Sequence, residues 1–419
     1  MPIRLSVKTA AALLAVFGLL FWNACAPAAE APKEIKVGLI FGLTGAASPI
    51  GPVQLDGAKF AIDETNAAGG LDWGGKKVPV KYVTKDDETK PDVAIRRFRE
   101  LVDEDKVQVV VGQTFAPISA ALNKEVKKEP IGYFPVNVVG LKMFEKDEMA
   151  PTTFAVHGCA YSAGYAGASY IVNKLKLKKV VFFGPAYAFG QDQWRGAKDA
   201  FDKYGMKVEY LESPVGTSDF TSYLTKIKEM NPEIVMLAHW GTDAINVLKQ
   251  ASETGLKKNT KIWFDWMTNV FGSGVPPEAL EGVYSLMSWY YDLTGFQDKE
   301  TVQQAGAFAE KFSKAFGYPP DPYSAMAYIG TKEALRGLSI ARSSSGEAVA
   351  KAIMSNPAFE SMKGKATWRE DHQPIFKYSA FVVVGKGASE RKDPKWDLVK
   401  VIDAYTGEDY LPPLKSLGY

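Results

Sequence analysis

A regular alternation of strand-like and helix-like segments runs through most of this 419-residue chain and constrains its fold more than any other feature. The first strand-like run is IKVGLIF (35–41), and helical spacing follows, with Leu55, Ala58 and Ile62 on one face. Repeated strand, helix, strand units predict a parallel sheet whose crossovers are right-handed. The predicted fold class is therefore α/β.

The alternation comes in two series, which predicts two lobes. In the first series the expected strands are 35–41, 78–84, 109–112 and 131–136, and in the second they are 178–184, 206–211, 233–238 and 260–264. Helix signals return at 302–316, 323–341 and 347–354, and strand signals at 376–384 and 396–404. No Gly/Ser or proline linker separates the halves, so we expect several short crossings that act as a hinge.

The N-terminus has the pattern of a secretory signal peptide. Arg4 and Lys8 precede an apolar run from Ala10 to Trp22, and the small-residue stretch ACAPAA follows. We predict a signal peptide over 1–28 and a mature protein in the periplasm. Lipid attachment at Cys25 stays open as an alternative to its loss with the signal.

Charge and cysteine content exclude several classes of protein. Removing Arg4 and Lys8 from the 50 basic residues leaves 48, which equals the 48 acidic residues. A formally neutral mature chain does not favour nucleic acid as a partner. Of the 2 cysteines only Cys159 remains after cleavage, so no internal disulfide is expected.

Catalytic and metal-binding motifs do not emerge from the sequence. His157, His239 and His372 are far apart and form no metal-ligand spacing. The glycine-rich stretch GLTGAASPIG (42–51) has neither GxGxxG spacing nor a GK[ST] ending, and the chain has no GxSxG elbow. We therefore predict a binding protein rather than an enzyme, with no metal and no cofactor.

Aromatic residues gather where strands are expected to end. Phe115, Tyr187, Phe189, Trp240 and Trp266 all follow predicted strands. The carboxyl ends of parallel strands are where α/β proteins bind ligands. These rings are therefore candidates for a ligand wall, with core packing as the alternative.

Several stretches, in this order along the mature chain, carry a family resemblance: VGLIFGLTGAASPIG (37–51), NAAGG (66–70), VVVGQTFAPISAAL (109–122), AYAFGQDQWRGAKDAF (186–201) and AEKFSKAFGYPPDPYSAMAYIGTKEAL (309–335). The chain resembles the periplasmic solute-binding proteins of the branched-chain amino acid ABC transporter family. The resemblance implies two doubly wound parallel-sheet lobes joined by a three-segment hinge, the type I periplasmic binding protein fold. We place lobe 1 at 34–153 plus 286–365 and lobe 2 at 154–285 plus 366–419.

The same resemblance implies the site and the partners. It points to a small-molecule ligand held between closing lobes, a monomeric protein and release to an ABC transporter permease; a ligand-sensing protein of this fold is the alternative. The matching positions give the predicted ligand-binding residues, which are Ile50, Gln113, Thr114, Phe115, Asn137, Val138, Tyr187, Phe189, His239, Trp240, Asp265 and Trp266.

Residue types at these positions depart from the family pattern. Ile50 stands where an aromatic hydroxyl is common, Phe115 lies in a serine region and Phe189 replaces a tyrosine. Each change removes a hydrogen-bonding group. The resemblance implies a branched-chain or hydrophobic amino acid as the ligand, and Asp265 is the only acid in register to hold its ammonium group. A less polar or aromatic carboxylate is the alternative, which the aromatic residues among these positions would suit better. Free amides where a helix follows Gln113–Phe115 are expected to hold the ligand's oxygen.

Overall fold

Two main sheets contain the two series of strands predicted from the sequence. The computed structural model describes residues 30–419, so the predicted signal peptide and Cys25 lie outside the described residues. The first sheet has the order β4-β1-β5-β6, and its neighbouring strands are all parallel. Its strands are β1 (Ile35–Phe41), β4 (Val80–Asp86), β5 (Val109–Gly112) and β6 (Gly132–Pro135).

The second sheet has the order β16-β15-β11-β10-β9-β7-β8, with β15 and β16 antiparallel. Its strands are β7 (Val180–Pro185), β8 (Glu209–Ser213), β9 (Ile234–Leu237), β10 (Lys261–Phe264), β11 (Tyr284–Met287), β15 (Ala380–Gly385) and β16 (Val399–Tyr405). In the first sheet β1 lies between β4 and β5, and in the second sheet β7 lies between β8 and β9. In each sheet, therefore, the strand that comes first in the sequence is flanked by the next two. The strand order therefore reverses between β1 and β5 and between β7 and β9, which are the switch points where such sheets bind ligands.

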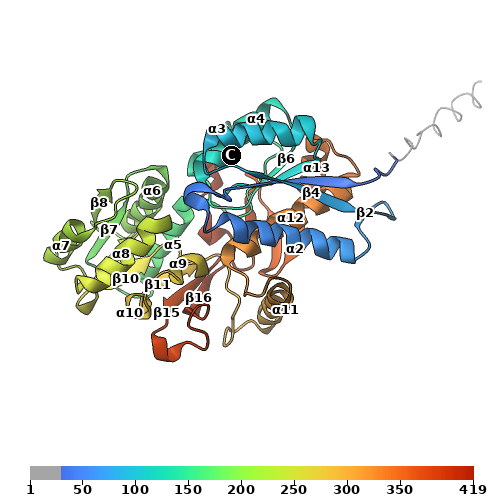
Figure 1. Ribbon diagram of the computed structural model, residues 1–419. Helices are drawn as coiled ribbons and strands as arrows, with labels where there is room; N and C mark the ends of the chain where they lie inside the picture. Colours follow the sequence, from blue (N-terminus) through green and yellow to red (C-terminus); the bar gives the residue numbers. More distant parts are fainter. Residues whose placement is uncertain (1–29) are drawn as a thin grey trace, which may run out of the picture. The chain divides into compact units, whose positions relative to one another are not determined.

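Helices cover both faces of the first sheet, as a doubly wound fold requires (Figure 1). One face carries α3 (Pro91–Arg99) and α4 (Ala116–Lys128), and the other carries α2 (Gly51–Ala67) and α12 (Pro322–Ala341). On the strand side of α3 and α4, Phe98 and Leu122 pack into one apolar cluster with Val110 of β5. The remaining helices of this part are α11 (Lys299–Phe316), which packs on α2 through Phe308 and Phe60, and α13 (Gly346–Ser355).

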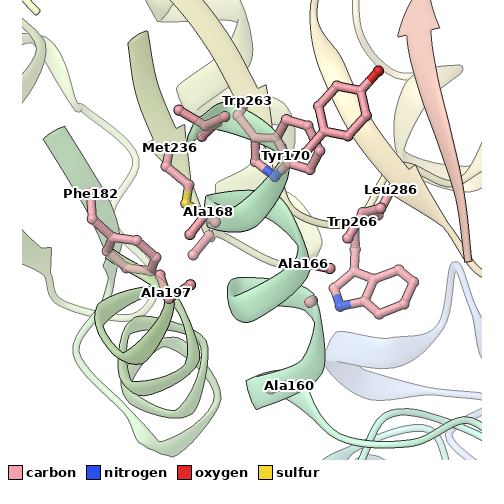
Figure 2. Close-up of a cluster of buried hydrophobic side chains, with 14 of the residues drawn as sticks. Ala160, Ala166, Ala168, Tyr170, Phe182, Ala197, Met236, Trp263, Trp266 and Leu286 are labelled. Carbon is pink, nitrogen blue, oxygen red and sulfur yellow. The ribbon is translucent and has the colours of Figure 1, made fainter. Parts of the chain in front are cut away.

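The core of the second sheet is built on closely packed helices (Figure 2). Its helices are α5 (Ala160–Asn173), α6 (Ala188–Lys203), α7 (Thr221–Glu229), α8 (Gly241–Glu253), α9 (Asn269–Gly272) and α10 (Pro277–Leu280). Trp263 is fully buried beside Met236 and against Tyr170 of α5, whose ring centroid lies 5.6 Å away. Small residues let α5 and α6 touch: a Cβ on Gly164 would lie 1.9 Å from the carbonyl oxygen of Gln193.

Some elements differ from the sequence predictions. The run 376–384 was expected to be one strand, but it is divided between β14 (Pro374–Phe376) and β15; β14 pairs with β13 (Gly364–Trp368), which in turn pairs with β12 (Ala358–Ser361). Beyond its last residue, Arg99, the helix α3 continues as a π-turn at Glu100–Glu104. No helix was predicted at α5, and no strand was predicted at β11 or at the hairpin of β2 (Leu71–Trp73) and β3 (Lys76–Val78).

The fold class is confirmed, while the lobe boundaries stay a prediction. The name "first lobe" is used for the parts of the chain that build on the first sheet, and "second lobe" for those that build on the second.

Short 3-10 turns lie at Gly45–Ala47, Leu141–Phe144, Leu256–Lys258, Ala388–Glu390, Gly407–Tyr410 and Leu414–Leu417. Between residues 30 and 419 no helix is both long and apolar enough to cross a membrane.

Candidate ligand-binding site

Three helices that follow the switch-point strands begin at an aromatic residue. The N-cap residues are Phe115 for α4, Tyr187 for α6 and Trp240 for α8, all with extended backbone. Serine, threonine, aspartate or asparagine usually fills this position and bonds the free amides of the first turn. In the part of the chain that the structure describes, no side chain caps these three helices. In α6 and α8 the first-turn amides and the positive end of the helix dipole are therefore open to a ligand. In α4 the expected free amides are fewer, because Pro117 has no N–H and the N–H of Ile118 donates to the carbonyl oxygen of Phe115 at 2.9 Å, which leaves the amide of Ala116.

All three rings line one cavity, to which both lobes contribute. Its other lining residues are Thr114, Ala116, Asn137, Val138, His157, Phe189, Trp266, Thr268, Ser288, Pro322 and Tyr323. The free volume of the cavity is about 20 Å³, which is room for about one water molecule. The walls therefore lie close together, and a guest the size of an amino acid requires the lobes or the rings to move apart.

Ring contacts hold this wall together. Phe115 stacks on Trp240 with a centroid distance of 5.9 Å, and Tyr187 stacks on Phe189 at the same distance. The first contact joins the two lobes, because Phe115 follows β5 and Trp240 follows β9. Flat rings on both sides favour a flat or branched apolar guest.

Three buried polar groups on the wall have no hydrogen-bond partner within residues 30–419: Nδ1 of His157, Nε1 of Trp266 and Oγ of Ser288. Burial, followed by the positive charge of Lys363, lowers the pKa of His157 to about 3, so its ring is neutral at pH 7. A neutral imidazole, an indole N–H and a hydroxyl can each donate one hydrogen bond. Together they suit an acceptor such as a carboxylate oxygen, because an unpaired buried polar group is costly.

The side chain of Asn137 orders the wall. Its Nδ2 donates to the carbonyl oxygen of Thr114, and its Oδ1 accepts from the backbone N–H of Val138 at 2.8 Å. Thr114 in turn accepts from the N–H of Gly42 through Oγ1 at 3.1 Å, which ties the wall to the end of β1. These bonds fix the backbone around Phe115.

Comparison with known proteins identifies the family. Residues 34–388 match the sequence profile of the periplasmic binding proteins. The chain belongs to the periplasmic binding protein family. A relative named "Amino acid binding protein" from Pseudomonas aeruginosa is 27% identical over 359 residues, which are 84% of this chain and 90% of that protein.

Solved structures of periplasmic binding proteins share the fold. An amino acid ABC transporter substrate-binding protein from Pseudomonas fluorescens Pf-5 has a TM-score of 0.80 and 24% identity, covering 93% of this chain and 99% of that one. A solute-binding protein of an ABC transporter from R. palustris, in complex with benzoate, has a TM-score of 0.74 and 20% identity, covering 89% and 97%. The predicted type I periplasmic binding protein fold is thereby confirmed.

Eight of the twelve residues predicted for the ligand site of this periplasmic binding protein lie on the cavity wall: Thr114, Phe115, Asn137, Val138, Tyr187, Phe189, Trp240 and Trp266. Of these, Thr114 and Asn137 use their side-chain hydrogen bonds to hold the wall together, and Nε1 of Trp266 is buried without a partner among the described residues. Whether each contacts a ligand stays a prediction.

Two predicted residues, Ile50 and Gln113, do not line this cavity. Ile50 is buried in an apolar cluster with Phe271 and Tyr323, so its side chain supports the wall from behind. Gln113 has a positive φ of 76°, is fully buried, and its amide finds no partner among the described residues. Such strained backbone is typical of functional turns, and here it directs the chain from β5 toward Phe115.

His239 and Asp265 also lie away from the cavity wall. His239 packs into the second lobe, with Nε2 3.1 Å from Oγ of Ser213 and its ring 4.6 Å from that of Phe183. Asp265 accepts from Nε1 of Trp263 at 2.7 Å, and burial raises the pKa of its carboxyl to about 8. A neutral buried acid cannot pair with an ammonium group. The expected partner for an amino acid's ammonium is thus off the wall.

Other wall residues were not among the twelve: Ala116, His157, Thr268, Ser288, Pro322 and Tyr323. Ala116, Pro322 and Tyr323 fall inside stretches that carry the family resemblance, and Thr268 lies two residues after the predicted Trp266. His157 and Ser288 lie outside strands and helices, between β6 and α5 and just after β11. No sequence periodicity marks them. The structure also shows no cluster of three or more His, Cys, Asp or Glu that could hold a metal within the described residues.

Proposed function

We propose that this protein is the extracytoplasmic binding component of an ABC importer and captures a small organic carboxylate between its lobes. The observation that carries the proposal is the cavity at the two switch points, which is walled by Phe115, Tyr187 and Trp240 and supplied with unpaired hydrogen-bond donors. Binding without chemistry is what such a site can do: it holds, orients and releases.

The two ends of the cavity wall have different tasks in this proposal. The carboxylate accepts hydrogen bonds from Nε1 of Trp266 and Oγ of Ser288, and from a tautomer of His157 that carries its proton on Nδ1. The apolar part of the ligand lies between the stacked rings, where the burial of carbon surface contributes about 25 cal/mol per Å². Hinge motion brings Trp240 over the ligand once its polar end is fixed.

The wall favours a carboxylate without an ammonium group. Among residues 30–419, no side chain that lines the cavity is charged, and burying an unpaired ammonium would cost several kcal/mol. One relative is named for amino acids and one solved structure of the fold holds benzoate. Both ligand types share a carboxylate, but the uncharged aromatic wall suits the second, so we expect an aromatic or branched aliphatic acid.

The remaining roles follow from this function. We propose that the signal peptide over 1–28 directs a monomer to the periplasm, that a permease receives the ligand from the closed protein, and that the protein returns its ligand unchanged. A dissociation constant near micromolar, about 8 kcal/mol, suffices for capture and still allows release.

The test is a melting-temperature screen of the mature chain from Ala29. Amino acids, their amides and aliphatic and aromatic acids are added one at a time, because a solute that binds only the folded state raises the melting temperature. We expect benzoate-like and branched aliphatic acids to raise it more than leucine or isoleucine. A response to amino acids alone would contradict the ligand class, and no response to any solute would contradict the function.

A further inference from the structure

The segment Gly317–Tyr323, which is the connection between α11 and α12 together with the first two residues of α12, contacts both lobes. It belongs to the first lobe, yet the ring of Tyr318 stacks on Trp396 of the second at 5.8 Å. The ring of Tyr323 meets Phe271 of α9 edge to face at 6.2 Å. Between these two ring contacts lies Asp321.

Asp321 caps two helices at once. Its Oδ1 accepts from the backbone N–H of Tyr323 at 2.8 Å, which caps α12, and Oγ of Ser324 closes the capping box by accepting from the N–H of Asp321 at 2.8 Å. Its Oδ2 accepts from the N–H of Val270 at 3.1 Å, in the first turn of α9. Since α12 packs on the first sheet and α9 follows β10 of the second, one carboxylate bonds both lobes.

The apolar surroundings of Asp321 strengthen its hydrogen bond to α9. Asp321 is only 1% exposed, and the adjacent cluster of Ile50, Phe271 and Tyr323 keeps water away from it. Burial raises the pKa of its carboxyl to about 6, against the lowering effect of the N–H donors of Tyr323, Val270 and Asn269. The group is therefore mostly ionised at pH 7, and hydrogen bonds to a charged acceptor in dry surroundings are strong.

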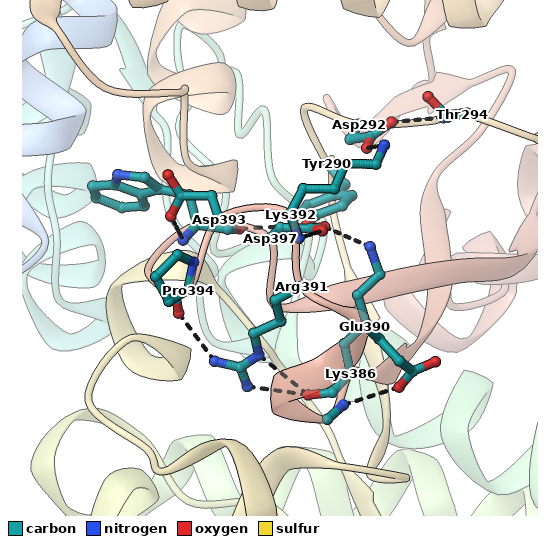
Figure 3. Close-up of polar contacts among 12 residues, drawn as sticks. Tyr290, Asp292, Thr294, Lys386, Glu390, Arg391, Lys392, Asp393, Pro394 and Asp397 are labelled. Atoms are coloured by element: carbon teal, nitrogen blue, oxygen red, sulfur yellow. Dashed lines mark hydrogen bonds and ion pairs between the residues drawn. The ribbon is translucent and has the colours of Figure 1, made fainter.

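The second contact of the connection rests on a firmly held loop. Trp396 lies in the loop between β15 and β16, where Asp397 accepts from Nζ of Lys386 at 2.5 Å and from the backbone N–H of Lys392 at 2.8 Å (Figure 3). In the same loop Arg391 donates to the carbonyl oxygens of Lys386 and Pro394. The stacking of Trp396 on Tyr318 thus joins two ordered segments.

We propose that Asp321 is a positioning residue that fastens the two lobes in the closed state and so sets the distance between the cavity walls. Thr268, which precedes α9, and Tyr323, in the first turn of α12, both line the cavity, so the bond of Asp321 to α9 fixes one wall residue of each lobe relative to the other. That this closed state serves to capture a ligand rests on the proposed function. The hydrogen bond between Asp321 and α9 does not depend on that function.

The variants separate fastening from helix capping. In Asp321→Ser the hydroxyl can still cap α12, since serine is a good N-cap residue, but it is too short to bond α9 as well. Asp321→Ala loses both bonds. Ser345→Ala is the matched control, because Ser345 caps α13 of the first lobe through the N–H of Ala348 and is exposed.

The separation of the lobes is measured as the distance between spin labels on Lys124→Cys of α4 and Ser222→Cys of α7, which are both exposed positions. Cys159 is buried, so the labels are directed to the two introduced cysteines. The distance is recorded without solute and with benzoate. In the parent protein, which carries only the two label sites, we expect a population with a short distance between the labels. In Asp321→Ser this population should fall about tenfold, the factor corresponding to 1.4 kcal/mol. The melting temperature of Asp321→Ser should stay near that of the parent protein. Ser345→Ala should lower the melting temperature and leave the distances unchanged.

Two outcomes would overturn the proposal. One is the same distance distribution in Asp321→Ser, Asp321→Ala and the parent protein; the other is a parent protein with no short-distance population in either sample. Asp321→Ser keeps the test informative if Asp321→Ala does not fold. Failure of the proposed function would show separately, as a melting temperature that no solute raises.

Discussion

The ring of Phe115 lies stacked on the indole of Trp240, with 5.9 Å between the ring centroids and 29° between the ring planes. Each residue is the N-cap of a helix, α4 in the first lobe and α8 in the second. Their backbones are therefore fixed by the starts of two helices, and the stack marks where the two walls of the cavity meet. A flat ligand that enters the cavity would have to separate these rings.

Replacing Trp240 with alanine should weaken ligand binding at least about tenfold, which corresponds to about 1.4 kcal/mol. The indole supplies contact area on the apolar part of the ligand, as buried aromatic anchors do at binding sites. Isothermal titration calorimetry with the solute that most raises the melting temperature measures the change.

A matched control for this variant is Trp194→Ala. Trp194 stacks on Tyr210 at 4.7 Å but does not line the cavity. It should lose stability and keep its affinity for the ligand, while Trp240→Phe should retain most of the binding. Unchanged affinity in Trp240→Ala would remove this residue from the site.

The sequence predicts the sheets well because their strands are continuous runs of apolar, mostly branched residues. Val109–Gly112 is buried along its whole length and was expected to be a strand for that reason. The aromatic wall was predictable for a similar reason: Phe115, Tyr187 and Trp240 come directly after strands, where parallel sheets present ligand sites.

Periodicity does not reveal the rest. The helix α5 was not predicted because most residues of its AYSAGYAGASY stretch are small, so the stretch shows little contrast between an apolar and a polar face. The close packing of Gly164 against α6 gives the reason for these small residues. Asp265 was predicted to bind the ligand, but its side chain does not line the cavity. The direction in which a side chain points from a strand end depends on tertiary packing. His157 and Ser288 reach the cavity from segments outside the helices and strands.

Ser288→Ala should have opposite effects on binding and on stability. The hydroxyl is buried without a partner in the described residues, so its loss should leave the free energy of unfolding unchanged or raise it by up to about 1 kcal/mol. If the hydroxyl donates to the ligand carboxylate, affinity should fall about threefold to tenfold, the equivalent of about 0.5–1.5 kcal/mol. Chemical denaturation and calorimetry measure the two quantities; lower stability with unchanged affinity would make Ser288 a structural residue.

Gly164→Ala should destabilise the second lobe. The added Cβ would lie 1.9 Å from the carbonyl oxygen of Gln193, and since that atom belongs to the backbone of α6, the two helices must separate. Overpacking of this kind costs about 1–3 kcal/mol or more. Gly306→Ala is the control: Gly306 lies in α11 with no atom near the added Cβ, so alanine should stabilise by about 0.5–1 kcal/mol. Equal effects of both changes in urea denaturation would contradict the close contact of α5 and α6.

Asp265→Asn should stabilise the protein at pH 8 more than at pH 5. Burial raises the pKa of Asp265 to about 8, with the bond from Trp263 acting in the opposite direction. Because the folded-state pKa lies above the unfolded value, the folded state holds the extra proton between about pH 4 and pH 8, and its stability falls as pH rises through this range. Asparagine keeps an oxygen for Nε1 of Trp263 and does not titrate.

The measured quantity for Asp265→Asn is the difference in the free energy of unfolding between variant and parent protein at each pH. Asp87 and Asp321, whose pKa values burial raises to about 6, and Lys363, whose pKa burial lowers to about 7, titrate in both proteins, so their contributions cancel in the difference. We expect this difference to grow by a few kcal/mol from pH 5 to pH 8, at about 1.4 kcal/mol per unit of pKa shift. A difference that stays constant would mean that the carboxyl of Asp265 is ionised in the folded state.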